Sequence, residues 1–386
     1  MIYLDNAATT PVRREALEAM WPYLGASFGN PSSHHQVGEA AAAALQEARR
    51  SVARSLGCRP GEVTFTSGGT ESDNVAIKGI ALGSPRGRHI VTSSIEHEAV
   101  LQSCDYLRRL HDFEITLLPV DAAGRVDPAD LARALRPDST LVSLHYANNE
   151  VGTVQPLAEL AAVAHEYGVP FHTDAVQAGG WLDLNVTTLG VDALSLSGHK
   201  LGAPPGIGAV FLRGRLPIEP LLHGGGQERG KRSGTENVAG ALALAVALRL
   251  AGEERAQAAD HTSALRDEFI GTVLGQTPAA RLTGHPTDRL PGTASFVFPG
   301  TSGEAVLLEL EARGIVCSSG SACAAGSSEP SHVLTAMGIS ADVAQTAVRF
   351  TLGVGTTAVE AEAAAASVQS AVAAVARLGA APHGSA

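Results

Sequence analysis

The sequence predicts an α/β fold in which a mostly parallel sheet is covered by helices and is followed by a smaller α+β unit. From about residue 60 to residue 215, short β-branched or apolar runs alternate with Ala-rich helical stretches, which is the pattern of repeated βα units. Later in the chain, strand and helix patterns flank a stretch rich in Gly and Ser. A chain of 386 residues is long enough for two domains and a large buried core.

We expect strands of the main sheet at five runs, which span residues 62–66, 88–92, 140–145, 169–173 and 193–197. An apolar segment over about 235–251, then Gly252 and a charged helix around 253–266, is predicted to connect the domains. The smaller unit is predicted as a strand, a helix, a loop, a strand and a terminal helix, at 293–298, 304–312, 318–328, 347–352 and 359–378. Ligands of open α/β sheets bind beyond the carboxyl ends of the strands, so polar residues directly after these runs are candidates for a site.

Composition argues against several classes of protein. Hydrophobic residues make up 45% and charged residues 17%, which is ordinary for a folded domain, and the net charge of -11 without a long basic run argues against nucleic-acid binding. Residues 1–20 lack the apolar centre of a signal peptide and no run has transmembrane length, so we expect a cytoplasmic protein that binds no membrane. The four cysteines show no CxxC spacing and the histidines no HExxH motif, so we expect reduced thiols and no catalytic metal.

The segment from Thr66 to Asn74 places glycines and small hydroxyl side chains between a predicted strand and a predicted helix. Free N–H groups and the helix dipole favour an anion such as phosphate at that point. A capped turn without a ligand is the alternative interpretation. The spacing is neither that of a Walker loop nor that of the dinucleotide fingerprint.

Three further strand ends carry groups that suit pyridoxal phosphate. Lys200 follows the run 193–197. Desolvation lowers the pKa of a buried lysine, and the neutral amine can then form a Schiff base. A solvated lysine in a loop is the alternative interpretation. Asp174 ends another apolar strand, where a carboxylate needs a cationic partner such as a protonated pyridine nitrogen; an N-cap aspartate is the alternative. Gln177 is close enough in sequence to reach the ring hydroxyl, and the imidazole of His97 could stack on the ring or relay protons.

Cys323 lies among Ser, Gly and Ala residues that are too small to pack a core. A free cysteine has a pKa of about 8.5, so an exposed one is a few per cent thiolate at neutral pH and is a usable nucleophile. Cys317 directly follows an apolar run, which favours a buried structural role. Cys58 and Cys104 have no comparable setting.

Together these segments resemble the cysteine desulfurase family of pyridoxal-phosphate enzymes, of the nitrogen-fixation and iron-sulfur-cluster type, over almost the whole chain. The matching segments, in chain order, are residues 3–11, 66–74, 148–152, 172–177, 197–200, 224–229 with 232–235, 318–323 and 349–353. The resemblance implies fold type I of the pyridoxal-phosphate transferases, with a seven-stranded sheet in a large domain of residues 15–255. It also implies a small α+β domain, of residues 1–14 and 256–386, that carries the cysteine loop.

The resemblance further implies a role for each candidate residue. Lys200 would hold the cofactor covalently, Asp174 would pair with the pyridine nitrogen, and His97 would stack on the ring. The remaining ring, phosphate and substrate contacts would be made by Gln177 and Asn149 (ring oxygen or substrate), Gly69, Thr70, Ser197 and His199 (phosphate), Thr235 (phosphate in the partner subunit of a homodimer), Arg349 (substrate carboxylate) and Asn30 (border of the substrate site).

The implied reaction removes sulfur from L-cysteine, leaving L-alanine and a persulfide on Cys323 that is passed to an acceptor such as an iron-sulfur scaffold protein. The acceptor and the pathway stay open. Two alternatives also stay open: another enzyme of the same fold, such as an aminotransferase or a selenocysteine lyase, and a sulfur-relay or scaffold-binding protein without catalysis.

Overall fold

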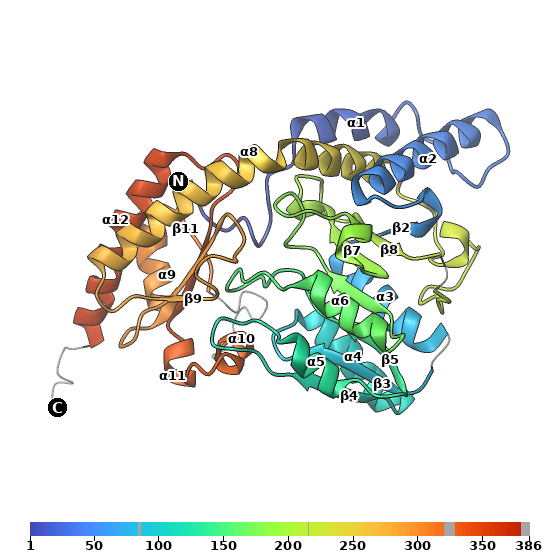
Figure 1. Ribbon diagram of the computed structural model, residues 1–386. Helices are drawn as coiled ribbons and strands as arrows, with labels where there is room; N and C mark the ends of the chain where they lie inside the picture. The colour runs from blue at the N-terminus through green and yellow to red at the C-terminus, as the bar shows by residue number, and fades with distance from the viewer. Residues whose placement is uncertain (84–85, 215, 320–328, 380–386) are drawn as a thin grey trace, which may run out of the picture.

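The computed structural model describes residues 1–83, 86–214, 216–319 and 329–379, and its centre is a seven-stranded sheet (Figure 1). The strand order is β2-β8-β7-β6-β5-β3-β4; β8 is antiparallel to both of its neighbours and the other neighbouring pairs are parallel. The predicted α/β fold class is therefore confirmed. The strands are β2 (Val63–Thr66), β3 (His89–Ser93), β4 (Glu114–Leu118), β5 (Ser139–Ser143), β6 (Phe171–Asp174), β7 (Ala193–Ser197) and β8 (Gly208–Leu212).

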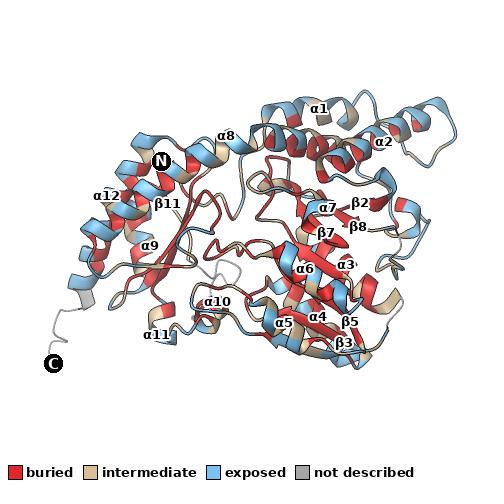
Figure 2. Ribbon diagram, in the orientation of Figure 1, coloured by how far each residue is buried: buried red, intermediate tan, exposed pale blue. Residues whose placement is uncertain are grey.

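Helices cover both faces of this sheet because successive side chains along each strand point to opposite faces. On β5, Leu141 packs in a cluster with residues of α3 and α4, whereas the next residue, Val142, packs in a cluster with residues of α2, α6 and α8. The strands other than the edge strand β4 are buried along their length, as the red strands of Figure 2 show. The helices of this part are α1 (Arg14–Leu24), α2 (Gln36–Leu56), α3 (Gly69–Gly83), α4 (Glu98–His111), α5 (Pro128–Ala134), α6 (Leu157–Glu166) and α7 (Val186–Leu189).

A second hydrophobic core lies around an antiparallel sheet of order β12-β10-β9. Phe269, Phe296 and Phe350 contact one another at its centre, with ring centroids 5.0 to 6.3 Å apart. The N-terminal strand joins this core, because β1 pairs in parallel with β11. The elements here are β1 (Ile2–Tyr3), β9 (Arg281–Thr283), β10 (Thr293–Val297), α9 (Gly303–Ala312), β11 (Ile315–Val316), α10 (His332–Ala336), α11 (Ala341–Ala344), β12 (Ala347–Thr351) and α12 (Ala358–Gly379).

The predicted connector is one continuous helix, α8 (Val238–Gln276), which runs along the top of Figure 1 from one core to the other. Its first half buries Ala and Leu side chains in the core of the large sheet, and its last part buries Leu265, Phe269 and Val273 in the second core. We propose two domains that divide within this helix, at the boundaries 15–255 and 1–14 with 256–386. No helix in the described ranges has the length and apolarity that a bilayer span requires.

Candidate active site

A cavity of about 340 Å³ lies at the carboxyl ends of the strands of the large sheet. It is lined by residues that follow β2, β3, β5, β6 and β7, by Ala7 and Ala8 of the N-terminal segment, and by Arg349 of β12. A larger hollow of about 510 Å³ adjoins it between the N-terminal segment and α8. The predicted site residues that line the smaller cavity are Gly69, Thr70, His97, Asn149, Asp174, Gln177, Ser197, His199, Lys200 and Arg349.

One end of the cavity has the features of an anion-binding site. Helix α3 begins there at Gly69, next to Thr70 and to Ser197 at the end of β7, so main-chain N–H groups and hydroxyl groups converge on it. A Cβ atom at Gly69 would lie 2.7 Å from Cγ2 of Val176 and 3.5 Å from Cβ of Ser197. Glycine is therefore required at the start of this helix, because the loop after β6 packs directly against it.

Asp174, at the end of β6, contributes a carboxyl group to the cavity, which favours a cation rather than an anion. Its Oδ1 atom accepts a hydrogen bond of 2.9 Å from the main-chain N–H of Val176. Burial raises the pKa of this carboxyl, and the neighbouring His97 acts against that shift. The carboxylate thus lies in a setting where a cationic partner in the cavity would offset its desolvation.

Lys200 lies in the short 3₁₀ turn directly after β7 and lines the same cavity as Asp174 and the start of α3. The chain contains three lysines, and of these Lys200 lines the cavity; Lys78 bonds to Asn74 and Lys231 lies in the loop after the turn Glu228–Gly230. The Nζ atom of Lys200 donates to the main-chain oxygens of Ala7 and Ala8, the latter at 2.6 Å. An amine with such access to the cavity is placed for covalent chemistry with a bound carbonyl compound.

Two imidazoles and an amide border the same space. His97 caps α4, and its Nδ1 accepts a hydrogen bond from the N–H of Ala99, which leaves the proton of a neutral ring on Nε2. Burial, and to a lesser extent Lys200, lower the pKa of His199 to about 4, so its ring is neutral at pH 7. Gln177 donates to the main-chain oxygen of Ala7 at 3.0 Å, which ties the N-terminal segment to the cavity wall.

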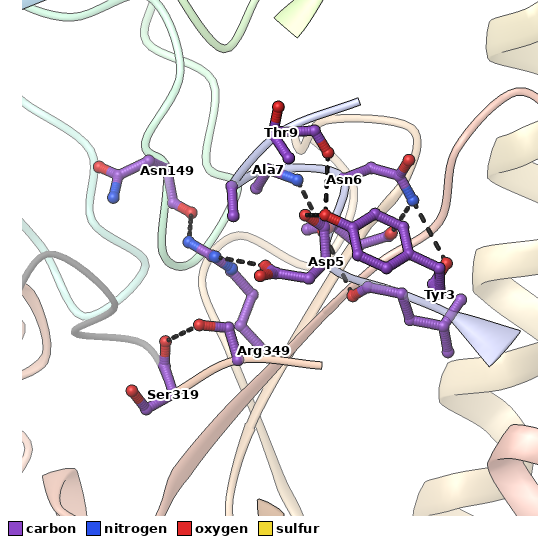
Figure 3. Close-up of polar contacts among 12 residues, drawn as sticks. Tyr3, Asp5, Asn6, Ala7, Thr9, Asn149, Ser319 and Arg349 are labelled. Carbon is purple, nitrogen blue, oxygen red and sulfur yellow. Dashed lines mark hydrogen bonds and ion pairs between the residues drawn. The ribbon is translucent and has the colours of Figure 1, made fainter. Parts of the chain in front are cut away.

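Arg349 brings a guanidinium group from the second core into the cavity, where Figure 3 shows it between Asp5 and Asn149. Its NH2 atom bonds to Oδ1 of Asp5 at 2.9 Å, and its NH1 atom donates to the main-chain oxygen of Asn149 at 2.7 Å. The buried Nε atom has no hydrogen-bond partner within the described residues. A planar guanidinium held in this way is suited to bind a carboxylate.

Comparison with known proteins identifies the family. The model of the family "Aminotransferase class-V" matches residues 2–363. A protein from Dictyoglomus turgidum named cysteine desulfurase IscS is 49% identical over 92% of this chain and 90% of its own length. An IscS-like cysteine desulfurase of Mycobacterium tuberculosis is 46% identical over 92% of this chain and 91% of its own length. The chain belongs to the cysteine desulfurase family.

Solved structures agree with this family assignment and with its fold. A structure described as a NifS-like protein superposes with a TM-score of 0.89 at 37% identity, covering 96% of this chain and 98% of its own. A structure described as SspA in complex with cysteine superposes with a TM-score of 0.81 at 38% identity, covering 92% of this chain and 99% of its own. The prediction of a desulfurase with the fold of these enzymes is confirmed.

Two predicted residues of the desulfurase site lie outside the cavity. Thr235 and Asn30 are exposed and do not line the cavity. Cys323 lies outside the described residues. No group of three or more His, Cys, Asp or Glu side chains in the described ranges is arranged to hold a metal ion.

The cavity also contains two titratable residues for which the sequence analysis gave no role, Asp73 and His145. Asp73 belongs to the first turns of α3, within the glycine-rich segment, and His145 follows β5. The chain has fourteen histidines, and most of them follow no strand. Position directly after a strand is therefore the signal that could have pointed to His145.

Proposed function

We propose that this chain removes the sulfur atom of L-cysteine with pyridoxal 5′-phosphate held at Lys200, and that Cys323 receives the sulfur as a persulfide. The single observation that carries the proposal is the convergence, in one cavity, of an anion-binding helix end, the amine of Lys200 and the carboxyl of Asp174. These three groups match the phosphate, the aldehyde and the pyridine nitrogen of the cofactor. The close packing at Gly69 leaves that helix end free of side-chain bulk, which suits a phosphate.

The predicted residues that line the cavity each have a role in this proposal. Gly69, Thr70, Ser197 and the neutral His199 bind the phosphate, and Gln177 and Asn149 contact ring oxygen or substrate. When bound, pyridoxal phosphate withdraws electrons from the α-carbon of an attached amino acid and so stabilises negative charge there. Arg349 orients the substrate through its carboxylate. Asn30 is exposed outside this cavity, and we propose that it borders the substrate site from there.

Side chains of the site hold or transfer the protons of the proposed reaction. Lys200 takes the α-proton of the substrate, since its amine ends beside the site where the amino acid binds. His97, with its Nδ1 engaged by Ala99, exchanges a proton through Nε2. Asp174 stays ionised and balances the positive charge on the pyridine nitrogen.

The thiol of Cys323 attacks the sulfur of the substrate, so that an S–S bond forms while the C–S bond of the substrate breaks. Cysteine and the protein thiol thereby give alanine and a protein persulfide, with no other oxidant or reductant. Elimination supports the choice of Cys323, because burial raises the pKa of Cys58, Cys104 and Cys317 to about 12 in each case. Such thiols carry almost no thiolate at neutral pH.

A homodimer and a protein acceptor complete the proposal. Thr235 is exposed, as a residue must be if it reaches the phosphate in a partner subunit. The first helix, α1, and the turn after it expose Leu17, Trp21, Leu24 and Phe28, an apolar surface of the kind that subunit contacts cover. We place the enzyme in the cytoplasm, where an acceptor such as an iron-sulfur scaffold protein takes the persulfide sulfur.

The test combines product analysis with mass spectrometry. With pyridoxal phosphate, cysteine and a reductant, the chain is expected to yield equimolar alanine and sulfide. Cys323→Ala is expected to lose both products while it keeps the yellow cofactor, and Cys58→Ala serves as the matched control with full activity. A protein persulfide that persists in Cys323→Ala would disprove the role of that residue.

Cofactor attachment is tested separately by borohydride reduction and peptide mapping. The three lysines make the result unambiguous, since the adduct must fall on Lys78, Lys200 or Lys231. We expect it on Lys200 and expect no adduct in Lys200→Ala. An adduct on either of the other lysines would refute the assignment.

A further inference from the structure

A buried acid and a buried histidine lie behind the carboxyl that faces the cofactor site. Glu96, in the loop after β3, is 1% exposed, and His145, just after β5, is 4% exposed. The two oxygens of Glu96 hold His145 at two points: Oε1 lies 3.1 Å from the ring Nδ1, and Oε2 accepts from the main-chain N–H at 2.9 Å. Ser93 donates to the same carboxylate at 2.5 Å. Glu96 therefore fixes the position of the imidazole and places a carboxylate beside its Nδ1 atom.

The second ring nitrogen of His145 is left without a partner. Among the described residues, nothing forms a hydrogen bond with this buried Nε2 atom. Buried polar atoms without partners are rare and costly, so each one calls for an explanation. His145 lines the cavity together with Asp174 and Asp73, so its unpartnered side belongs to the cofactor site.

We propose that His145 is a positioning residue: held by Glu96, it acts as a fixed buried cation that keeps the carboxylate of Asp174 ionised for the ring nitrogen of the cofactor. The proposal rests on the proposed function, because it takes the ring nitrogen of the cofactor as the charged partner of Asp174 in the cavity. It adds a buried chain of alternating charge, Glu96, His145 and Asp174, that ends at the carboxylate facing the cofactor.

The electrostatics of the surrounding groups agree with this arrangement. Burial disfavours charge on His145, yet the carboxylates of Glu96 and Asp174 outweigh it and raise the pKa of the imidazole. For Asp174, burial raises the pKa, and His97 and His145 both act to lower it. Burial, and after it the charge of Asp174, raise the pKa of Asp73 well above its usual range, which favours the neutral form of this carboxyl.

A neighbouring histidine shows what a neutral packed imidazole looks like in this fold. Both ring nitrogens of His172, on β6, bond to hydroxyl groups, those of Ser143 at 2.8 Å and Ser195 at 2.9 Å. Burial lowers the pKa of His172 to about 3. His145 differs in both respects, since it has a carboxylate partner on one nitrogen and, among the described residues, no hydrogen-bond partner on the other.

The experiment measures how tightly the cofactor-free chain binds pyridoxal phosphate between pH 5 and pH 9, by the absorbance of the bound cofactor. We compare wild type with His145→Gln and Glu96→Gln, which remove charge and keep shape and hydrogen-bonding capacity. The matched control is His165→Gln, which removes another histidine paired with a carboxylate, that of Asp192 at 2.7 Å, away from the cavity. Thermal unfolding of each cofactor-free chain checks that it is folded.

In wild type, protonation of Asp174 weakens binding as the pH falls. Without the cation at His145, the pKa of Asp174 rises, so this loss of affinity is expected to begin about one pH unit higher, with binding roughly tenfold weaker near that pH. Glu96→Gln is expected to change binding in the same direction, and His165→Gln to leave it unchanged.

Three outcomes would overturn the proposal. A His145→Gln chain with wild-type affinity throughout would do so, and so would a loss of affinity equal at every pH, which marks a purely structural role. If His145→Gln does not fold, Glu96→Gln decides on the same two criteria. A wild-type chain that binds no pyridoxal phosphate would overturn the proposed function itself, and this inference with it.

Discussion

The reactivity of the four thiols gives a quantitative test of which cysteine carries the sulfur. Burial raises the pKa of Cys58, Cys104 and Cys317 to about 12. At pH 8 such a thiol is thiolate in about one molecule in ten thousand, whereas an ordinary thiol with a pKa of about 8.5 is thiolate in roughly a quarter of molecules. Since the thiolate is the reacting form, we expect Cys323 to alkylate on the order of two thousand times faster than the other three.

The assay is a brief pulse of iodoacetamide on the folded chain, followed by peptide mass spectrometry. Cys323 is expected to be labelled first, and Cys323→Ser is expected to lose the fast phase. The chain unfolded in urea is the control, because all four thiols then have similar pKa values and should react at similar rates. Fast labelling of Cys58, Cys104 or Cys317 in the folded chain would refute the reasoning, as would slow labelling of Cys323.

The remaining predictions concern buried charge, backbone packing and pH. In the wild-type chain the carboxylate of Glu228 lies 2.6 Å from the buried guanidinium of Arg49. Glu228→Gln leaves that cation buried without its carboxylate partner and should lower the free energy of unfolding by about 3–5 kcal/mol. The expected drop in the unfolding midpoint is about 4–6 °C by calorimetry, and a drop below about 2 °C would contradict it. Gly208→Ala would place a Cβ atom 2.7 Å from the Cα of Gly68, so the loop at the anion end must move, and weaker binding of pyridoxal phosphate is expected in a titration. The matched control is Gly252→Ala in α8, where the new Cβ meets open space; equal affinities for the two variants would count against the packing argument. His172 stays neutral in the fold with a pKa of about 3 against 6.5 in the unfolded chain, so its contribution to stability is present above pH 6.5 and declines as the pH falls from 6.5 toward 3. The unfolding midpoint of His172→Gln should therefore fall less steeply over that range than that of wild type.

Much of the fold could be predicted because burial imposes a simple pattern on a parallel sheet. The five predicted strands correspond to β2, β3, β5, β6 and β7, each of them a short apolar run buried on both faces. The edge strand β4 was not predicted, and its partly exposed residues explain why it lacks such a run. The strand β8 was not predicted either, since it directly follows a stretch rich in Gly and Pro, which is a composition typical of loops.

The cavity shows which part of a site local sequence can indicate. Asp174, His97 and Lys200 follow strands of one sheet, so the rule that ligands bind at strand ends already places them together. Arg349 follows no such rule, because its strand belongs to the second core and reaches the cavity through tertiary packing. The family resemblance, rather than any pattern in the neighbouring residues, pointed to it.

The contacts of Arg349 indicate how substrate binding and the two cores are connected. Asp5 comes directly after Leu4, which lies in the second core, and its carboxylate bonds to the NH2 atom of Arg349, while NH1 bonds to the chain at Asn149, next to the large sheet. Each terminal nitrogen of the guanidinium carries two N–H groups, so a substrate carboxylate can pair with the second N–H of each while both contacts remain. The two contacts therefore hold the guanidinium between the N-terminal segment and the loop after β5. The orientation of Arg349 toward a substrate carboxylate thus depends on the packing of the N-terminal segment, whose Ala7 and Ala8 also bond to Lys200.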